Sequence, residues 1–193
     1  MSDPVEVLDY WLDAVGPEGW YAGGVELDDE IRTLWADLWN AAREGGLDHW
    51  VDGAAGTLAY IILCDQFPRN MWRGEAKAFA TDPLALAAAR KALAHGWDLR
   101  APEPERQFFY MPFEHSEDPE DQVLAVELME DRLPADPELA LHARAHQAII
   151  ARFGRFPYRN DALGRHSTTE ETLFMREGGY ASIVKDLRAA ATK

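Results

Sequence analysis

The chain has 193 residues, of which 34 are Asp or Glu and 19 are Lys or Arg, so its formal net charge at pH 7 is -15. With 47% hydrophobic residues and 7 tryptophans it has enough apolar side chain for a buried core, which excludes intrinsic disorder. The negative charge argues against binding to nucleic acid or to an anionic membrane, and the single cysteine, Cys64, excludes a disulfide within the chain.

The start of the chain and its apolar runs indicate where the protein resides. Met1 and Ser2 lead into an acidic segment that lacks the basic residues of a secretory signal peptide. The longest uncharged run, Gly53–Cys64, has 12 residues, whereas a membrane-spanning helix needs about 20. The sequence therefore predicts a cytoplasmic protein with no membrane or nucleic-acid partner.

The residue types favour helix along the whole chain. Alanine and leucine together number 50, whereas valine and isoleucine number 14, and the first pair favours helix while the second favours strand. We expect one all-α domain over residues 1–193, with about eight helices arranged in antiparallel pairs as in bundles and α-solenoids. The predicted helices cover residues 4–15, 28–44, 54–66, 82–95, 104–110, 119–133 and 137–153, a short segment capped at 167–171, and 180–190.

Asp-Pro pairs mark four of the predicted helix starts, because aspartate favours the first turn with its free N–H groups and proline fits within that turn. These pairs lie at residues 3–4, 82–83, 118–119 and 136–137. A further start offers two overlapping capping boxes, Ser167 with Glu170 and Thr168 with Glu171, and the sequence alone leaves the choice open.

Two other segments are distinguished by their composition. Residues 54–66 are apolar on all sides, which predicts the central buried helix. Residues 16–24 are rich in glycine and hold Trp20 and Tyr21, which predicts a loop between the first two helices.

The charged residues are unevenly distributed. Residues 1–52 carry a net charge of -11 and residues 114–138 a net charge of -9, whereas residues 147–167 contain four arginines and carry +3. The basic segment includes Phe156–Asn160, which echoes Phe67–Asn70, since each begins with Phe-Pro and follows an apolar helical segment. We interpret both as helix-exit loops.

If these two loops meet, their polar side chains form a cationic pocket, because the planar arginine fork suits a carboxylate or phosphate. The residues concerned are Arg69, Asn70, Arg155, Arg159 and Asn160. The alternative is that these arginines neutralise acids of the protein itself and satisfy carbonyl groups at helix ends.

Two further groups could carry a proton. Asp65 ends the predicted central helix, and a buried carboxylate there needs a partner such as Arg69, so it is either a structural ion pair or a ligand-binding or catalytic group. His115, followed by Ser116 and Glu117, is either a general base beside a carboxylate or part of a helix entry.

His142 and His146 are four residues apart and share one helix face, so they could bind zinc with Glu117 as a third ligand. The glutamate of the zincin motif is absent between them, and the chain has no cysteine pair. We therefore expect hydrogen-bonded core histidines, no metal and no cofactor.

Several strings resemble domain-of-unknown-function family 924. They are Asp65–Asn70, Ala78–Asp82, Tyr110–Asp118 and Arg152–Asn160, and the resemblance extends from about residue 7 to residue 177. It implies an all-helical fold similar to that of tetratricopeptide-repeat proteins, and it implies no reaction. Tyr158 departs from the family pattern, where histidine is common, and Glu114 departs where an apolar residue is more usual.

Carried over motif by motif, the polar signature of the family falls on eleven residues of this chain. They are Asp65, Gln66, Arg69, Asn70, His115, Ser116, Glu117, His146, Arg155, Arg159 and Asn160. We take His115 and Asp65 as the candidate catalytic residues and the other nine as candidate ligand-binding residues.

Two functions fit these residues. The leading hypothesis is a polar pocket for a small anionic molecule, clamped by the arginines and oriented by the asparagines, with His115 or Asp65 handling a proton. The alternative is a tetratricopeptide-like interaction module that binds a basic protein partner through residues 114–138 and the loop around Trp20. A purely structural role for the motifs remains, and the sequence leaves open both enzymatic activity and homo-oligomer formation.

Overall fold

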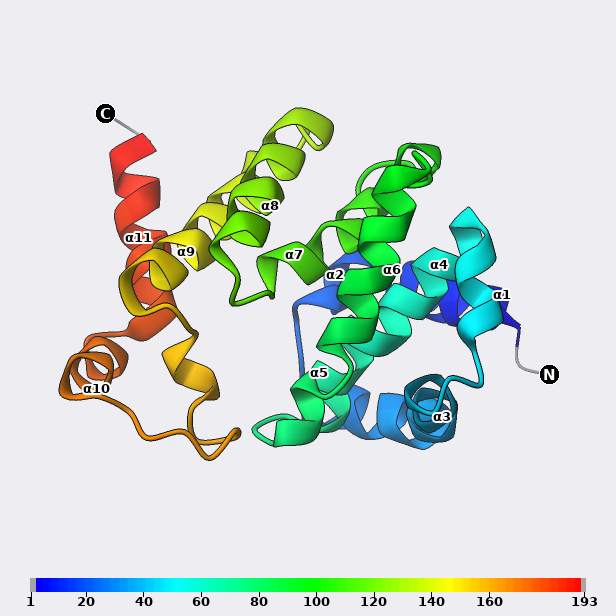
Figure 1. The fold of residues 1–193 in the computed structure, drawn as a ribbon, viewed down its shortest axis with the longest axis horizontal. Coiled ribbons are helices and arrows are strands. Elements are labelled where there is room, and N and C mark those ends of the chain that lie inside the picture. The colour runs from blue at the N-terminus through cyan, green and yellow to red at the C-terminus, as the bar shows by residue number, and fades with distance from the viewer. Residues whose placement is uncertain (1–2, 192–193) are drawn as a thin grey trace. The chain divides into compact units, whose positions relative to one another are not determined.

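The structure, a computed structural model, describes residues 3–191. Every regular element in that range is helical (Figure 1), which confirms the predicted all-α fold. The chain forms two compact units, residues 1–112 and residues 113–193. None of the helices in the described range is long and apolar enough to cross a bilayer.

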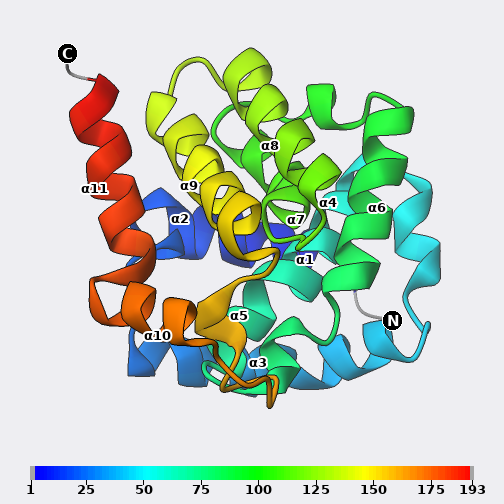
Figure 2. The ribbon, with the colours of Figure 1, turned by 60° about the vertical axis from the view of Figure 1, so that its left-hand side comes forward.

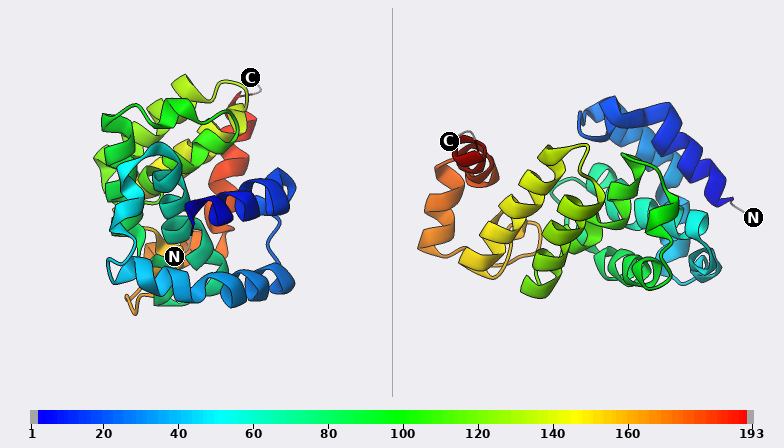
Figure 3. Two further views of the ribbon diagram at one scale, coloured as in Figure 1. Left: turned by 90° about the vertical axis from the view of Figure 1, so that its right-hand side faces the viewer. Right: turned by 90° about the horizontal axis from the view of Figure 1, so that it is seen from above.

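The first unit is built around one buried helical run. Its α-helices are α1 (Pro4–Leu8), α2 (Gly16–Trp20), α3 (Val25–Arg43), α4 (Ala54–Ile61), α5 (Phe67–Met71) and α6 (Asp82–Ala94). Two π-helical stretches, η1 (Asp9–Val15) and η3 (Ile62–Gln66), extend α1 and α4, and the short 3-10 segments are η2 (Asp48–Asp52), η4 (Ala76–Phe79), η5 (Asp98–Arg100) and η6 (Glu105–Phe109). Helix α4 contacts both α1 and α6, and α3 packs against α5 (Figure 3).

Burial confirms that the run from α4 through η3 is the centre of this unit. From Leu58 to Gln66 every residue is buried. Aromatic side chains cover this run, and the Phe67 ring that follows it lies 5.4 Å from Trp11 and 5.6 Å from Trp35 between ring centroids. Burial of large apolar side chains such as these supplies most of the stabilisation of a helical unit.

Two predicted loops of the first unit are helical instead. Residues 16–20 form α2, because Gly16 has φ of +63° and so turns the chain, after which Pro17 lies in a new first turn where its missing N–H costs nothing. For the same reason Pro68 is accommodated in the first turn of α5, directly after the π-helical residues 62–66. The interpretation of Phe67–Asn70 as a helix-exit loop was therefore wrong.

The second unit is a helical hairpin with two further helices. Its elements are α7 (Met111–Glu114), which begins at the boundary between the units, α8 (Pro119–Arg132), α9 (Pro137–Phe153), η7 (Pro157–Arg159), α10 (Thr169–Arg176) and α11 (Gly179–Ala191). A short connection makes α8 and α9 an antiparallel pair, and α11 packs against α9 and α10 (Figure 2).

The predicted end signals of this unit are confirmed. The side chains of Asp118 and Asp136 accept hydrogen bonds from the backbone N–H groups two residues later, at 2.8 and 3.0 Å. Of the two capping boxes, Thr168 with Glu171 forms. Helix α9 ends at Gly154, whose φ of +67° suits glycine, and the chain then enters the second Phe-Pro segment.

A substitution at Gly56 tests how closely α4 packs against the backbone of Trp50. A Cβ atom added there would lie 2.2 Å from the backbone carbonyl oxygen of Trp50, which cannot rotate away. We expect Gly56→Ala to lower the free energy of unfolding by about 1–3 kcal/mol despite the better helix propensity of alanine. Chemical denaturation measures this loss.

Gly53→Ala is the matched control, because Gly53 has an extended backbone and nothing lies within 4 Å of its added Cβ. At this helix cap we expect a loss of less than about 1 kcal/mol. Equal losses for the two variants would contradict the close approach.

Candidate functional site

In the first unit the predicted ion pair of Asp65 forms. The Asp65 side chain is fully buried, and Oδ1 lies 3.2 Å from Nη1 of Arg69, one helical turn later. Oδ2 accepts a hydrogen bond of 2.6 Å from Nε2 of Gln66. The Asp65 carboxylate therefore pairs with the Arg69 guanidinium and accepts a hydrogen bond from the side-chain amide of the adjacent Gln66.

The polar residues of α5 connect it to two neighbouring helices. The Arg69 fork donates to both carboxylate oxygens of Asp82 at the start of α6, at 3.0 and 3.1 Å. Asn70 donates 2.8 Å to Asp28 of α3, which also receives two hydrogen bonds from Arg73. Burial raises the pKa of Asp28, but the bonds from Arg73 and Asn70 hold it below its usual value.

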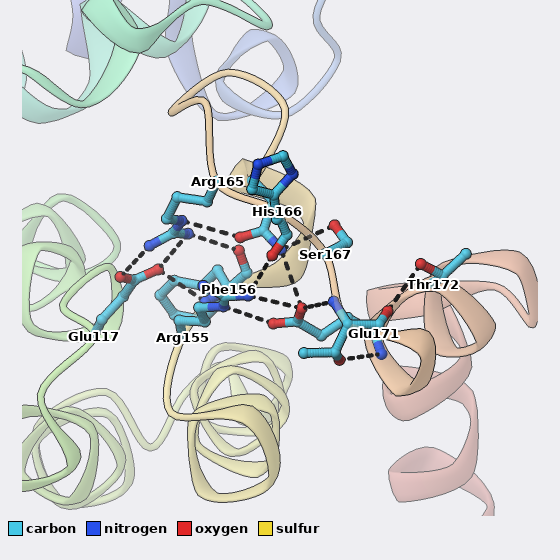
Figure 4. Close-up of polar contacts among 10 residues, drawn as sticks. Glu117, Arg155, Phe156, Arg165, His166, Ser167, Glu171 and Thr172 are labelled. Carbon is cyan, nitrogen blue, oxygen red and sulfur yellow. Dashed lines mark hydrogen bonds and ion pairs between the residues drawn. The ribbon is translucent and has the colours of Figure 1, made fainter.

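In the second unit, two glutamates bind the basic segment after α9 (Figure 4). Nε and Nη2 of Arg155 donate to the two carboxylate oxygens of Glu171 at 2.6 and 2.8 Å. Arg165 donates in the same bidentate manner to Glu117, at 2.7 and 3.0 Å. Bidentate arginine–carboxylate pairs are the strongest and most directional of the ordinary ion pairs.

Backbone and amide groups complete this network. Glu117 also accepts 2.8 Å from the backbone N–H of Phe156, and the side-chain oxygen of Asn160 accepts 3.0 Å from Arg165. The Asn160 amide in turn donates 3.1 Å to Ser167. Residues 155–167 are thereby held at the starts of α8 and α10.

Both glutamates are held in the charged form. Hydrogen bonds from Arg155, together with those from the Thr168 backbone and Asn160, lower the pKa of Glu171 to about 2. Burial raises the pKa of Glu117, but the bonds from Arg165 and from the Phe156 backbone hold it below its usual range.

A second polar group lies around His146 on α9. Nδ1 of His146 is 2.7 Å from Oε1 of Glu114, a carboxylate whose residue is only 5% exposed. Burial raises the pKa of Glu114, but the neighbouring His146, His115 and His142 hold it below its usual value. The His115 and His146 rings are 6.1 Å apart, so the structure groups two of the predicted site residues.

The Phe156 ring lies between this histidine group and an arginine. The edge-on ring of His146 is 5.5 Å from Phe156 between centroids, and the Arg159 guanidinium lies over Phe156 at 4.6 Å. Nη2 of Arg159 also donates 3.0 Å to the backbone carbonyl of His115. His146 and Arg159 therefore contact the same aromatic ring, and His115 lies beside both of them.

The remaining predicted residues have structural contacts. The hydroxyl of Ser116 accepts a 3.2 Å hydrogen bond from the backbone N–H of Asp118, at the entry to α8. His142 bonds through Nδ1 to the hydroxyl of Tyr180 on α11. Within residues 3–191 no three His, Cys, Asp or Glu side chains are placed to hold a metal ion.

Sequence reasoning did not select three residues of these networks as site residues. Glu171 was identified only as half of a capping box and Arg165 only as a basic residue, yet each anchors residues 155–167. Glu114 was noted only as a polar residue at a position where the family favours an apolar one. The signal available in the sequence was an acid directly before His115, at a position where the family favours an apolar residue.

Comparison with known proteins assigns the family. The family model described as "Bacterial protein of unknown function (DUF924)" matches residues 7–179. The chain belongs to the DUF924 family. A solved structure of the protein of unknown function ATU0120 from Agrobacterium tumefaciens is similar to this DUF924 chain, with 40% identity and a TM-score of 0.85, over 91% of this chain and 97% of the other. No curated protein matches the chain.

Arg155 tests whether its pair with Glu171 supports this unit. The Glu171 side chain is 3% exposed, so Arg155→Ala leaves a buried charge without its main partner. We expect the melting temperature to fall by roughly 5 °C or more. Differential scanning calorimetry measures the change.

Arg152→Ala is the control on the same segment. Arg152 pairs with Glu170 at 2.9 Å, but the Glu170 side chain is 61% exposed, so the pair contributes little. We expect less than about 2 °C of change. A similar effect of both substitutions would show that burial of Glu171 is not what gives the pair its importance.

Acid should remove the contribution of Glu171. Because folding lowers its pKa from 4.5 to about 2, the stabilisation is complete above the unfolded value and is lost as the pH falls toward the folded one. The difference in melting temperature between wild type and Glu171→Gln should therefore be constant above about pH 5 and should shrink between about pH 5 and pH 2. Glu170→Gln, at an exposed ion pair, is the control and should change the melting temperature little, and a constant difference between wild type and Glu171→Gln at all pH values would contradict the assignment.

Proposed function

We propose that the second unit binds a small anionic molecule at the residues around the Phe156 ring, namely His115, His146 and Arg159. The observation that carries the proposal is that the His146 imidazole and the Arg159 guanidinium contact the same ring, while Arg159 also bonds to the His115 backbone. An arginine fork matches the geometry of carboxylate and phosphate groups, and an imidazole can exchange hydrogen bonds with them.

The local charge supports an anionic ligand. The whole chain carries -15, which repels anions at long range, so binding needs a concentrated positive segment. Residues 147–167 contain four arginines and a single acid, and Arg152, Arg155 and Arg165 among them pair with glutamates outside the segment. This is the part of the sequence that reverses the sign of the surrounding charge.

We assign two roles to the basic residues from the contacts that each makes. Arg155 and Arg165 each use their fork on a glutamate of the protein itself, so we assign them, with Glu117 and Asn160, to holding residues 155–167 in place. Arg159 bonds to a backbone carbonyl and stacks on Phe156, and we assign it to the ligand. Ser116 holds the turn beside His115.

The candidate residues of the first unit fit a structural role. Asp65 and Arg69 bind each other, and Arg69 and Asn70 also bind acids at the start of α6 and on α3. These contacts, with the bond from Gln66 to Asp65, account for the polar Phe-Pro segment of that unit without a ligand. We therefore propose that the first unit supplies a scaffold and the second unit the ligand site.

Thermal shift of the purified full-length protein tests the proposal with three probes, inorganic phosphate, succinate and a nucleoside monophosphate. A probe at one hundred times its dissociation constant adds about 2.7 kcal/mol, which raises the melting temperature by roughly 5–10 °C. We expect at least one probe to stabilise wild type and to lose this effect in His146→Gln.

His142→Gln is the matched control, because His142 lies one turn earlier on α9 and bonds to Tyr180 rather than to Glu114. It should retain the shift. If none of the three probes stabilises wild type, or if the two variants respond equally, the anion site at Phe156 is wrong.

A further inference from the structure

We infer that His146 is a proton-accepting group and that Glu114 is the residue that positions it, so that the molecule bound beside Phe156 is an anion that also carries a dissociable O–H or N–H proton. That the proton donor is a bound anion rests on the proposed function. The state of His146 rests on the geometry of the free protein and is tested separately.

The contacts of Nδ1 define the tautomer of His146. Nδ1 faces two oxygen atoms, Oε1 of Glu114 at 2.7 Å and the backbone carbonyl of His142 at 3.0 Å. The backbone carbonyl oxygen has no hydrogen to donate, so it can only accept a hydrogen bond from Nδ1. Nδ1 must therefore carry the hydrogen, and in the neutral ring the lone pair lies on Nε2.

Glu114 is placed rigidly for this role. It lies at the end of α7, and the buried amide of Gln122 donates to the backbone carbonyls of Glu114 and Ser116, both at 2.6 Å. Burying a carboxylate costs free energy unless a partner compensates, and an apolar residue would fill the same space without that cost. The bond to His146 is the compensation.

The chemistry that follows is a proton transfer. The lone pair of Nε2 takes a proton from an O–H or N–H group of the bound anion, the electron pair of the broken bond stays on the ligand atom, and the resulting imidazolium is stabilised by Glu114. A carboxylate bonded to the other nitrogen orients the ring and fixes its tautomer. The His146 side chain is 12% exposed, so part of it is accessible from solvent.

Other polar groups surround the same ring. The titratable and charged side chains that face His146 are Glu114 and His115 from the segment before α8, His142 from its own helix, Tyr180 from α11, and Arg159 across the Phe156 ring. The tautomer measurement must therefore resolve His146 individually.

Nitrogen-15 NMR of the histidine rings reads the tautomer directly. At neutral pH we expect His146 to show a protonated Nδ1 and an unprotonated Nε2. His95 is the internal reference, because its Nδ1 also bonds to the carbonyl four residues earlier, at 2.9 Å, but in an exposed position. If His146 in wild type carries its hydrogen on Nε2, the inference is overturned without any variant.

Diethyl pyrocarbonate, which acylates an unprotonated imidazole nitrogen, tests the reactivity of Nε2. We expect mass spectrometry to locate the modification on His146 and its rate to fall roughly tenfold or more in Glu114→Gln, with partial rescue in Glu114→Asp. The rate at His95 should not change. A His146 that never reacts in folded wild type, or reacts equally fast without Glu114, contradicts the role of the pair.

These two measurements use no ligand, so they separate the two proposals. If the tautomer and the reactivity are as expected while phosphate, succinate and the nucleotide fail to bind, the proton-accepting pair stands and the anion site is wrong. If a probe binds but the tautomer is reversed, the anion site stands and the positioning role of Glu114 is wrong.

Discussion

The second unit depends on one buried carboxylate, that of Glu171. It receives both branches of the Arg155 fork, the backbone N–H of Thr168 and the amide of Asn160, so one side chain ties the end of α9 to the start of α10. A buried charge of this kind is costly unless each of its acceptor positions is used. The segment between these helices is therefore held by hydrogen bonds in addition to the apolar packing of Phe156 against Ile149, Ile150 and Phe174.

This arrangement also explains why the positive charge of residues 147–167 is not a simple clamp. Glu171 and Glu117 each neutralise one arginine and convert it into a support for the backbone around Phe156. A rigid support is what a binding site needs, since groups that are already in place lose little entropy when a ligand arrives. Under the proposed function, the structural and the ligand-binding interpretations of the arginines thus apply to different members of the same segment.

Interactions local in sequence were predictable, and long-range ones were not. The caps at Asp118 and Asp136 and the pair of Asp65 with Arg69 follow from spacings of two to four residues, which backbone geometry fixes. Glu117 and Arg165 are 48 residues apart, and only the packing of the unit makes them partners. The helical form of Phe67–Met71 was missed because Pro68 was interpreted as an ending, whereas after a π-helical turn it begins a helix.

The pair of Glu114 and His146 differs from the other ion pairs in what it leaves available. In the Arg155–Glu171 and Arg165–Glu117 pairs the bidentate bonds of the fork hold the chain, and arginine cannot release its proton at physiological pH. Histidine can exchange a proton in that range, and a bond through Nδ1 defines the state of Nε2 without occupying it. On our proposal, the same carboxylate chemistry therefore gives stability where its partner is arginine and a means of proton transfer where its partner is histidine.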